Sequence, residues 1–233
     1  MEVQEFLNVM HVAERLKDAT RHGYSSGGRR ESVAEHSWRI TLMAYFLQDE
    51  FPEADMQKVM EMCLIHDLGE CFTGDIPTFL KTDADEDREE QLLFNWVKSL
   101  PEPYAARMKA LYEEMAALKT QEAKIYKALD KMEAVLQHNE APLSTWIPRE
   151  YELNMSYGFD QAAFHPISPG SGSRCSPTRS GRSKRANKLY IVFFKRMDTI
   201  QASSRGGLLC FSDSEGAFCL IAREQKHFQT KMR

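Results

Sequence analysis

Several ionisable residues stand inside apolar segments of the sequence, where their types and spacing could support chemistry. The densest segment, Cys63–Phe79, reads C-L-I-H-D-L-G-E-C-F-T-G-D-I-P-T-F and holds His66, Asp67, Glu70 and Asp75. Buried charges cost several kcal/mol unless they are paired or bound to a metal. Either these groups lie at the surface, or they converge on a common partner.

A helix predicted from about Ala54 to Glu70 would bring three of these groups together. On such a helix, His66 and Asp67 are about 100° apart, and Glu70 follows one turn later. A metal on that face could bind His66 and Asp67, and Glu70 could reach a water bound to it. Two more ligands must then come from other parts of the chain.

His36 and Asp130 are the candidates for these ligands. His36 lies on an apolar helical face, where an unpaired imidazole is costly, and Asp130 has Tyr126 and Ala134 one turn to either side. Taken alone, His36 fits a core histidine and Asp130 fits half of a surface ion pair with a lysine. Because all four candidates fall on three predicted helices beside apolar faces, they jointly indicate a site for Mn, Fe, Co, Ni or Zn rather than Ca or Mg.

The elements that must position these residues read as helices. A first helix, with apolar residues at helical spacing, is predicted to end before Arg21, and Tyr24–Arg30 reads as a loop. Ser32 and Glu35 form a capping box that opens a helix to about Gln48. That helix is apolar almost all round, so we expect it to be central and buried. Its apolar residues include Trp38, Ile40, Leu42, Met43, Tyr45, Phe46 and Leu47.

The segments that follow also favour helices. Thr73–Pro77 turns the chain, and the acidic run Asp83–Glu90 is interpreted as the solvated start of a helix. Another helix is predicted within residues 101–118, and the next is capped by Thr120 and runs to about residue 139. Residues 141–159 are aromatic and interrupted by proline, which indicates a packed loop with a short helix.

Composition places the chain among soluble globular proteins. Of its 233 residues, 42% are hydrophobic and 27% are charged. The start, M-E-V-Q-E-F-L, shows no secretory signal, and no apolar run reaches the roughly 18 residues that span a bilayer. The five cysteines include no C-x-x-C pair, which argues against a disulfide framework or a cysteine-rich zinc site. We therefore expect a cytoplasmic protein.

Charge divides the chain near residue 164. Residues 1–164 hold 30 acidic and 17 basic residues, a net charge of −13, whereas residues 165–233 have a net charge of +9. Residues 165–189 contain no acid and are rich in Ser, Gly, Pro and Arg, a composition that predicts disorder. This atypical tail is either a genuine extension or the product of a shifted reading frame or gene-model error. The abrupt change in charge, composition and period favours the second explanation.

Four motifs resemble the HD-domain phosphohydrolases, and among them the small bacterial HD-domain 5′-deoxynucleotidases. They are S-V-A-E-H at 32–36, C-L-I-H-D-L-G-E at 63–70, T-G-D-I-P-T at 73–78 and A-L-D-K-M-E-A at 128–134. The resemblance covers about residues 1–164 and implies an all-α HD-domain bundle around a divalent metal. It implies that the metal ligands are His36, His66, Asp67 and Asp130.

The same resemblance assigns further roles. Glu70 matches the general acid/base, and Arg21 matches an arginine used near the phosphate, which its planar fork can bind. His22 matches a residue that contacts substrate, although some members have Trp there. Asp75 and the Ile76-Pro77-Thr78 that follows match the segment lining the nucleotide pocket.

The function that this resemblance implies is hydrolysis of nucleoside or deoxynucleoside 5′-monophosphates to nucleoside and phosphate, by a homodimer. Other HD-type hydrolases remain alternatives. Guanosine-tetraphosphate hydrolases show H-D-x-x-E-D, where Cys71 stands here, and cyclic-dinucleotide phosphodiesterases show H-D-x-G-K, where Glu70 stands. Deoxynucleoside-triphosphate hydrolases, the third HD-type alternative, are usually much longer. An alternative of a different class is a non-catalytic module that holds a metal and binds nucleic acid through its basic tail. Apart from that tail, we expect neither a nucleic-acid nor a membrane partner.

Overall fold

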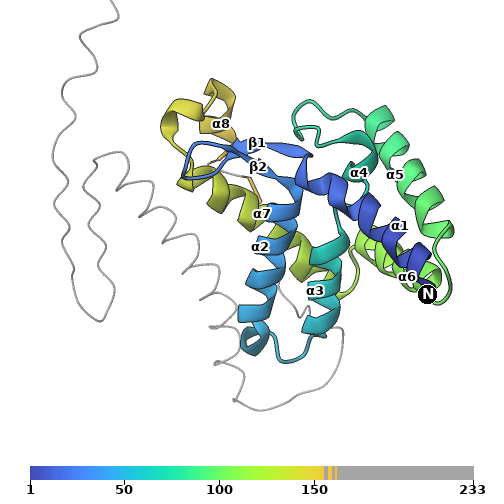
Figure 1. The fold of residues 1–233 in the computed structure, drawn as a ribbon. Coiled ribbons are helices and arrows are strands. Elements are labelled where there is room, and N and C mark those ends of the chain that lie inside the picture. Colours follow the sequence, from blue (N-terminus) through green and yellow to red (C-terminus); the bar gives the residue numbers. More distant parts are fainter. Residues whose placement is uncertain (155–156, 159–160, 162–233) are drawn as a thin grey trace, which may run out of the picture. The chain divides into compact units, whose positions relative to one another are not determined.

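Residues 1–154, 157–158 and 161 are described in a computed structural model of the chain. The domain boundary predicted near residue 164 and the atypical tail of residues 165–233 lie outside the described residues. Within them the fold is helical, as predicted, with one small hairpin (Figure 1). The helices are α1 (Val3–Glu14), α2 (Val33–Phe46), α3 (Met56–Ile65), α4 (Glu70–Thr73), α5 (Asp83–Lys98), α6 (Tyr104–Ala117), α7 (Gln121–Glu140) and α8 (Pro148–Leu153).

The core lies where α2, α3 and α7 pack against one another (Figure 1). Helix α2 starts as predicted, because the Ser32 side chain accepts a hydrogen bond from Glu35 N–H and the Glu35 side chain accepts one from Ser32 N–H. Thr120 caps α7 by accepting from Ala123 N–H at 3.2 Å. Capping of this kind fixes where each helix begins and so which residues face the core.

The prediction that α2 is buried almost all round is wrong. Its buried residues are Val33, His36, Ser37, Ile40 and Ala44, which form one face. On the opposite side Trp38, Tyr45 and Phe46 are 63%, 56% and 74% exposed. The reason is that α3 and α7 cover only one side of α2. Helix α1 likewise has no buried residue despite its apolar spacing.

The helix predicted from Ala54 to Glu70 is broken in the structure. Helix α3 ends at Ile65, a tight turn spans residues 66–69, and Glu70 begins the separate, short α4. Backbone bonds three residues apart make this turn, including Glu70 N–H to Asp67 O at 3.0 Å. Gly69 sits in the turn because a Cβ there would lie 2.8 Å from the Glu89 side chain of α5. The turn thus separates the His-Asp pair from Glu70, which begins the next helix.

The loop predicted at Tyr24–Arg30 belongs to a hairpin that the sequence did not reveal. Strand β1 (Thr20–Tyr24) pairs antiparallel with β2 (Arg30–Ser32), and Ser25 N–H donates to Arg29 O at 2.8 Å across the connection. The hairpin runs directly into α2. It therefore ties Arg21 and His22, on β1, to the helix that carries His36.

The remaining elements agree with the sequence. The acidic start of α5 is solvated and capped by Thr82, and α6 lies within the range predicted for it. Residues 141–154 form a 3₁₀ turn, Leu143–Thr145, and the short α8. Two further 3₁₀ turns span Arg15–Lys17 and Gln48–Glu50. Among the described residues, no helix combines the length and apolarity that crossing a membrane requires.

Candidate metal centre and adjoining pocket

The four predicted ligands meet in the interior, although they come from three distant parts of the chain. His66 Nε2 lies 3.0 Å from Asp67 Oδ2, and His36 Nε2 lies 3.9 Å from the same oxygen. His36, His66 and Asp67 each offer a ligand atom within 4.8 Å of the other two. Asp130 Oδ1, from α7, lies 3.4 Å from His36 Nε2 and 4.0 Å from His66 Nε2. The structure thus brings together the residues that the sequence singled out.

The two imidazoles present the same free nitrogen to this centre. His66 Nδ1 is 2.9 Å from Cys63 O, and His36 Nδ1 contacts the Glu133 carboxylate. Each Nδ1 therefore donates, so Nε2 is the nitrogen of each ring that remains for a metal ion. Neither Nε2 has a hydrogen-bond partner among the described residues. Two imidazole nitrogens turned towards two carboxylates fit a divalent transition-metal ion.

Nearby basic side chains stabilise the ionised forms of Asp67 and Asp130. Burial opposes the ionised form of Asp67, but His66, His36 and Arg21 outweigh burial and lower its pKa. Burial opposes the ionised form of Asp130, yet Lys131, Lys127 and His36 outweigh burial and hold its pKa well below the usual range. Its Oδ2 lies 2.9 Å from Lys127 Nζ and 3.5 Å from Lys131 Nζ. The lysines occupy one oxygen of Asp130, and the other faces the histidines.

Glu70 stands beside the centre in a contrasting environment. Burial, followed by the charges of Asp67 and Asp75, raises the pKa of Glu70 to about 10. Its Oε2 is buried without a hydrogen-bond partner among the described residues. An acid kept protonated in this way can exchange a proton with a neighbouring group.

Arg21 joins the centre to a pocket. Its Nη1 is 3.5 Å from Asp67 Oδ2, and its Nε is 3.3 Å from Glu31 Oε2. Burial opposes its charge, but Asp67, Asp75 and Glu31 outweigh burial and raise the pKa of Arg21. The guanidinium therefore stays charged at the boundary between the metal centre and the cavity.

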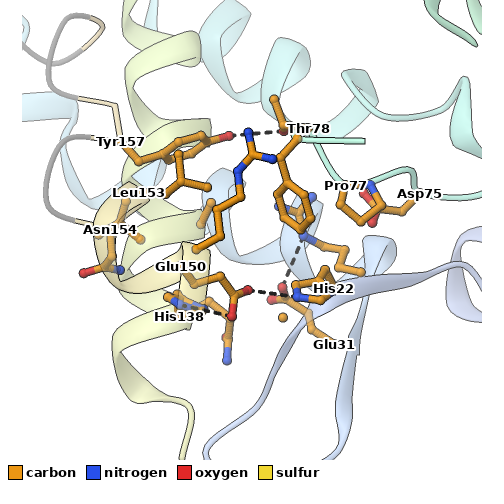
Figure 2. Close-up of a pocket in the computed structure, with 17 residues that line it drawn as sticks. His22, Glu31, Asp75, Pro77, Thr78, His138, Glu150, Leu153, Asn154 and Tyr157 are labelled. Carbon is orange, nitrogen blue, oxygen red and sulfur yellow. Dashed lines mark hydrogen bonds and ion pairs between the residues drawn. The ribbon is translucent and has the colours of Figure 1, made fainter. Parts of the chain in front are cut away.

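The cavity beyond Arg21 has a volume of about 370 Å³ and is drawn in Figure 2. Of the residues predicted to bind substrate, Arg21, His22, Asp75, Pro77 and Thr78 line it. Ile76 is half-buried and does not belong to the lining. The predicted segment after α4 thus forms one wall through Asp75, Pro77 and Thr78.

The opposite wall comes from α7, α8 and Tyr157, and sequence reasoning missed it. Glu150 of α8 points between His22 and His138 (Figure 2), with Oε1 2.9 Å from His22 Nε2 and Oε2 4.0 Å from His138 Nε2. Glu150 Oε2 also accepts from Ile147 N–H at 2.7 Å, which fixes the carboxylate at the start of α8. Nothing in the aromatic, proline-containing segment marked this glutamate in advance.

Aromatic rings complete the outer part of the pocket. Phe79 packs edge-on against His22 at 5.5 Å between centroids, and the Arg149 guanidinium lies 5.5 Å from the centroid of the Phe79 ring. Tyr157 lies at the other end (Figure 2), where its hydroxyl is 3.1 Å from Lys131 Nζ and 3.4 Å from Thr78 Oγ1. The outer part of the cavity therefore combines aromatic rings with the charged side chains of Arg149 and Glu150.

A family model for the HD domain matches residues 13–170, which include every residue of this site. The chain belongs to the HD domain family. The fold and the family that the sequence predicted are thereby confirmed. In HD-domain terms, the defining dipeptide is His66–Asp67, which lies in the turn after α3 rather than within a helix.

Similar HD proteins are known among curated sequences and solved structures. The chain is 31% identical over 141 residues to the 5′-deoxynucleotidase HDDC2 of Homo sapiens, covering 59% of this chain and 68% of that protein. A crystal structure of a predicted metal-dependent phosphohydrolase from Magnetospirillum magnetotacticum matches with a TM-score of 0.61 at 24% identity, covering 85% of this chain and 94% of that one. A cyanophage S-2L HD phosphohydrolase, DatZ, bound to dA and one catalytic Zn²⁺ ion, matches with a TM-score of 0.52 at 20% identity, covering 85% and 98%.

Proposed function

We propose that this HD-domain protein is a metal-dependent phosphomonoesterase that converts deoxynucleoside 5′-monophosphates, and nucleoside 5′-monophosphates as secondary substrates, to nucleoside and phosphate. One observation carries the proposal: a buried His/Asp cluster opens through Arg21 into a cavity of nucleoside size with aromatic walls. The 31% identity to a protein named 5′-deoxynucleotidase supports the same substrate class.

We assign the metal to His36, His66, Asp67 and Asp130. Two imidazoles and two carboxylates suit Mn, Co, Fe, Ni or Zn. When bound, such an ion supplies Lewis acidity toward a phosphate oxygen and makes water a better nucleophile at neutral pH. The remaining steps fall to side chains of this protein.

Arg21 is the residue that orients the phosphate. Its guanidinium lies 3.5 Å from Asp67 and lines the cavity, so it can donate two parallel hydrogen bonds to phosphate oxygens. Glu31 holds the other side of the guanidinium at 3.3 Å and keeps the fork from rotating away. Binding by Arg21 places the phosphorus at the mouth of the metal centre.

Glu70 is the residue that we assign to proton transfer. It is buried beside Asp67 and Asp75, and its Oε2 has no hydrogen-bond partner among the described residues. As a carboxylic acid it can protonate the departing 5′-oxygen of the nucleoside, and as a carboxylate it can take a proton from water. General acid–base help of this kind contributes about 10²–10⁴-fold in rate.

The aromatic end of the cavity is the part that we assign to the nucleoside. Phe79 and Tyr157 offer faces for a base or sugar, and His22 with Glu150 offers polar groups for ring nitrogens or hydroxyls. Pockets of this kind, apolar with a few fixed polar groups, bind small ligands specifically. Asp75 completes the wall near Arg21, and Thr78 lies beside Tyr157.

A homodimer and a cytoplasmic location remain predictions that accompany this function. The exposed aromatic residues of α2 are compatible with pairing of two copies. Light scattering on the purified protein should give a mass near twice the 26.8 kDa of the chain. A mass of one chain at micromolar concentration would contradict the dimer but not the proposed hydrolysis.

The substrate proposal is tested by phosphate release from the purified, metal-loaded protein. The substrates are the deoxy- and ribonucleoside 5′-monophosphates, with the matching 5′-diphosphates and 3′,5′-cyclic monophosphates as controls. We expect release from the monophosphates, fastest for the deoxy series. Faster turnover of the diphosphates or cyclic esters would favour another HD-type hydrolase, and no turnover of any nucleotide would favour the non-catalytic module.

A further inference from the structure

Glu133 is the most deeply buried carboxylate among the described residues, and no role follows for it from the site described above. It lies on α7 one turn after Asp130 and is 0% exposed. Its Oε2 contacts Nδ1 of His36, which is also 0% exposed. A carboxylate so far from water is costly unless close partners compensate it.

The two histidines of the metal centre differ in what holds their outer nitrogen. His66 Nδ1 donates to a backbone oxygen, Cys63 O, at 2.9 Å. His36 Nδ1 donates to the Glu133 carboxylate instead. A carboxylate behind a histidine fixes its tautomer and ring orientation and increases the basicity of the opposite nitrogen.

Glu133 is itself fixed from its far side. Arg39 of α2 places Nη1 3.5 Å from Glu133 Oε1 and donates from the same nitrogen to Gln137 Oε1 at 2.7 Å. The other terminal nitrogen, Nη2, donates to both Glu140 oxygens at 2.9 Å. Arg39 therefore links α2 to α7 directly behind the contact between His36 and Glu133.

We propose that Glu133 is a positioning residue for the metal centre. By accepting the Nδ1 proton of His36, it aims His36 Nε2 at the point shared with His66, Asp67 and Asp130. The inference rests on the proposed metal role of His36. The orientation of His36 then depends on the Glu133 side chain, which a substitution can remove. The orientation of His66 depends on a backbone oxygen, which a substitution leaves in place.

Four forms of the full chain test the proposal: the unchanged protein, Glu133→Gln, Glu133→Ala and Glu140→Gln. Gln keeps the size of Glu133 and an oxygen that can accept from Nδ1, whereas Ala removes the acceptor. Glu140→Gln is the matched control, because Glu140 is exposed and shares Arg39 but does not contact His36. Each metal-free protein is titrated with Co²⁺ alone, followed by calorimetry and the visible Co²⁺ absorption spectrum.

We expect Glu133→Ala to weaken Co²⁺ binding about 10–100-fold, the range found for partners behind a ligand. Glu133→Gln should fall between Glu133→Ala and the unchanged protein, with a shifted Co²⁺ spectrum, and Glu140→Gln should match the unchanged protein. Unchanged affinity and spectrum in folded Glu133→Gln and Glu133→Ala would overturn the inference. If Glu133→Ala does not fold, an unchanged spectrum and affinity in Glu133→Gln alone would do so.

Two other outcomes distinguish a positioning role of Glu133 from a role as metal ligand and from the absence of a metal centre. Glu31, His36 and Glu133 also offer ligand atoms within 4.8 Å of one another. A second Co²⁺ ion that disappears in Glu133→Gln would make Glu133 a ligand and overturn the positioning role. Absence of Co²⁺ binding by the unchanged protein would instead refute the proposed metal centre, and with it the basis of both proposals.

Discussion

The two ends of the functional cavity are built differently. The metal end draws its side chains from α2, α7 and the turn after α3, which form the buried core. The outer end uses one side of α7 but otherwise draws on the hairpin, the segment after α4 and the short α8, and its Arg149 is exposed. The helices that hold the core together thus fix the position of the chemistry, while peripheral segments shape the part that selects the substrate.

That contrast also decides what the sequence can predict. His36 and Asp130 stand on apolar helical faces. A polar group there is costly without a partner, so the sequence alone marks both residues as unusual. Glu133 belongs to the quoted A-L-D-K-M-E-A motif and was open to the same reasoning, since it follows Asp130 by one helical turn. Glu150 and Tyr157 lie in an irregular segment without a period, where no pattern indicates which side chain turns inward.

Two errors in the predicted fold lie in the core, and both come from tertiary packing. The turn at residues 66–69 was missed because its residues continue an apolar, helix-like pattern, and the close approach of Glu89 to Gly69 is a tertiary contact. Apolar residues all round α2 predict burial on every side, whereas among the described residues α3 and α7 make most of its contacts and leave Trp38, Tyr45 and Phe46 exposed. Local pattern specifies a helix, and only packing decides which faces are covered.

The largest effect should come from breaking the metal end. His66→Ala removes an imidazole that faces Asp67 at 3.0 Å. Loss of a residue that only supports a metal ligand weakens metal binding about 10–100-fold, and we expect the loss of Co²⁺ affinity in His66→Ala to be larger. Phosphate release should become undetectable. Calorimetric Co²⁺ titration checks this, with His11→Ala on the surface of α1 as the matched control. Unchanged Co²⁺ affinity in His66→Ala would mean that the metal binds at another site.

A second, smaller effect should separate chemistry from metal binding. Glu70→Gln should keep Co²⁺ affinity within a few-fold and lower kcat about 10²–10⁴-fold, because the amide cannot exchange a proton. Glu90→Gln, on the exposed side of α5, is the control. Steady-state phosphate release measures kcat, and an unchanged kcat in Glu70→Gln would remove this residue from the mechanism.

Substitution of Arg21, at the boundary between the two ends, should have an intermediate effect on activity. Arg21→Lys keeps a positive charge but loses the planar fork, so kcat/KM should fall about 10–100-fold. Co²⁺ affinity should change little, because Arg21 contacts Asp67 without being a ligand. The assay compares kcat/KM for a deoxynucleoside monophosphate with the Co²⁺ titration. Equal loss in both quantities would mean that Arg21 supports the metal rather than the phosphate.

The smallest effects should come from the outer end. Phe79→Ala should raise KM about 10-fold, since stacking of an aromatic ring on a base contributes about 1–3 kcal/mol, while kcat stays within a few-fold. Glu150→Gln should change the ranking of the four deoxynucleoside monophosphates rather than the rate for all of them. Saturation kinetics on each substrate distinguish these results. A fall in kcat alone, with KM and ranking unchanged, would contradict the division between the two ends.

The central claim is that the His/Asp cluster holds the ion on which phosphate release depends. Its most direct test is to strip the protein of metal, return Co²⁺ in steps, and follow bound Co²⁺ and phosphate release from a deoxynucleoside 5′-monophosphate together. We predict no release from the stripped protein, and a rate that rises in proportion to bound Co²⁺ until a single ion per chain is present. Full release from the stripped protein, or saturation with Co²⁺ without any release, would contradict the account.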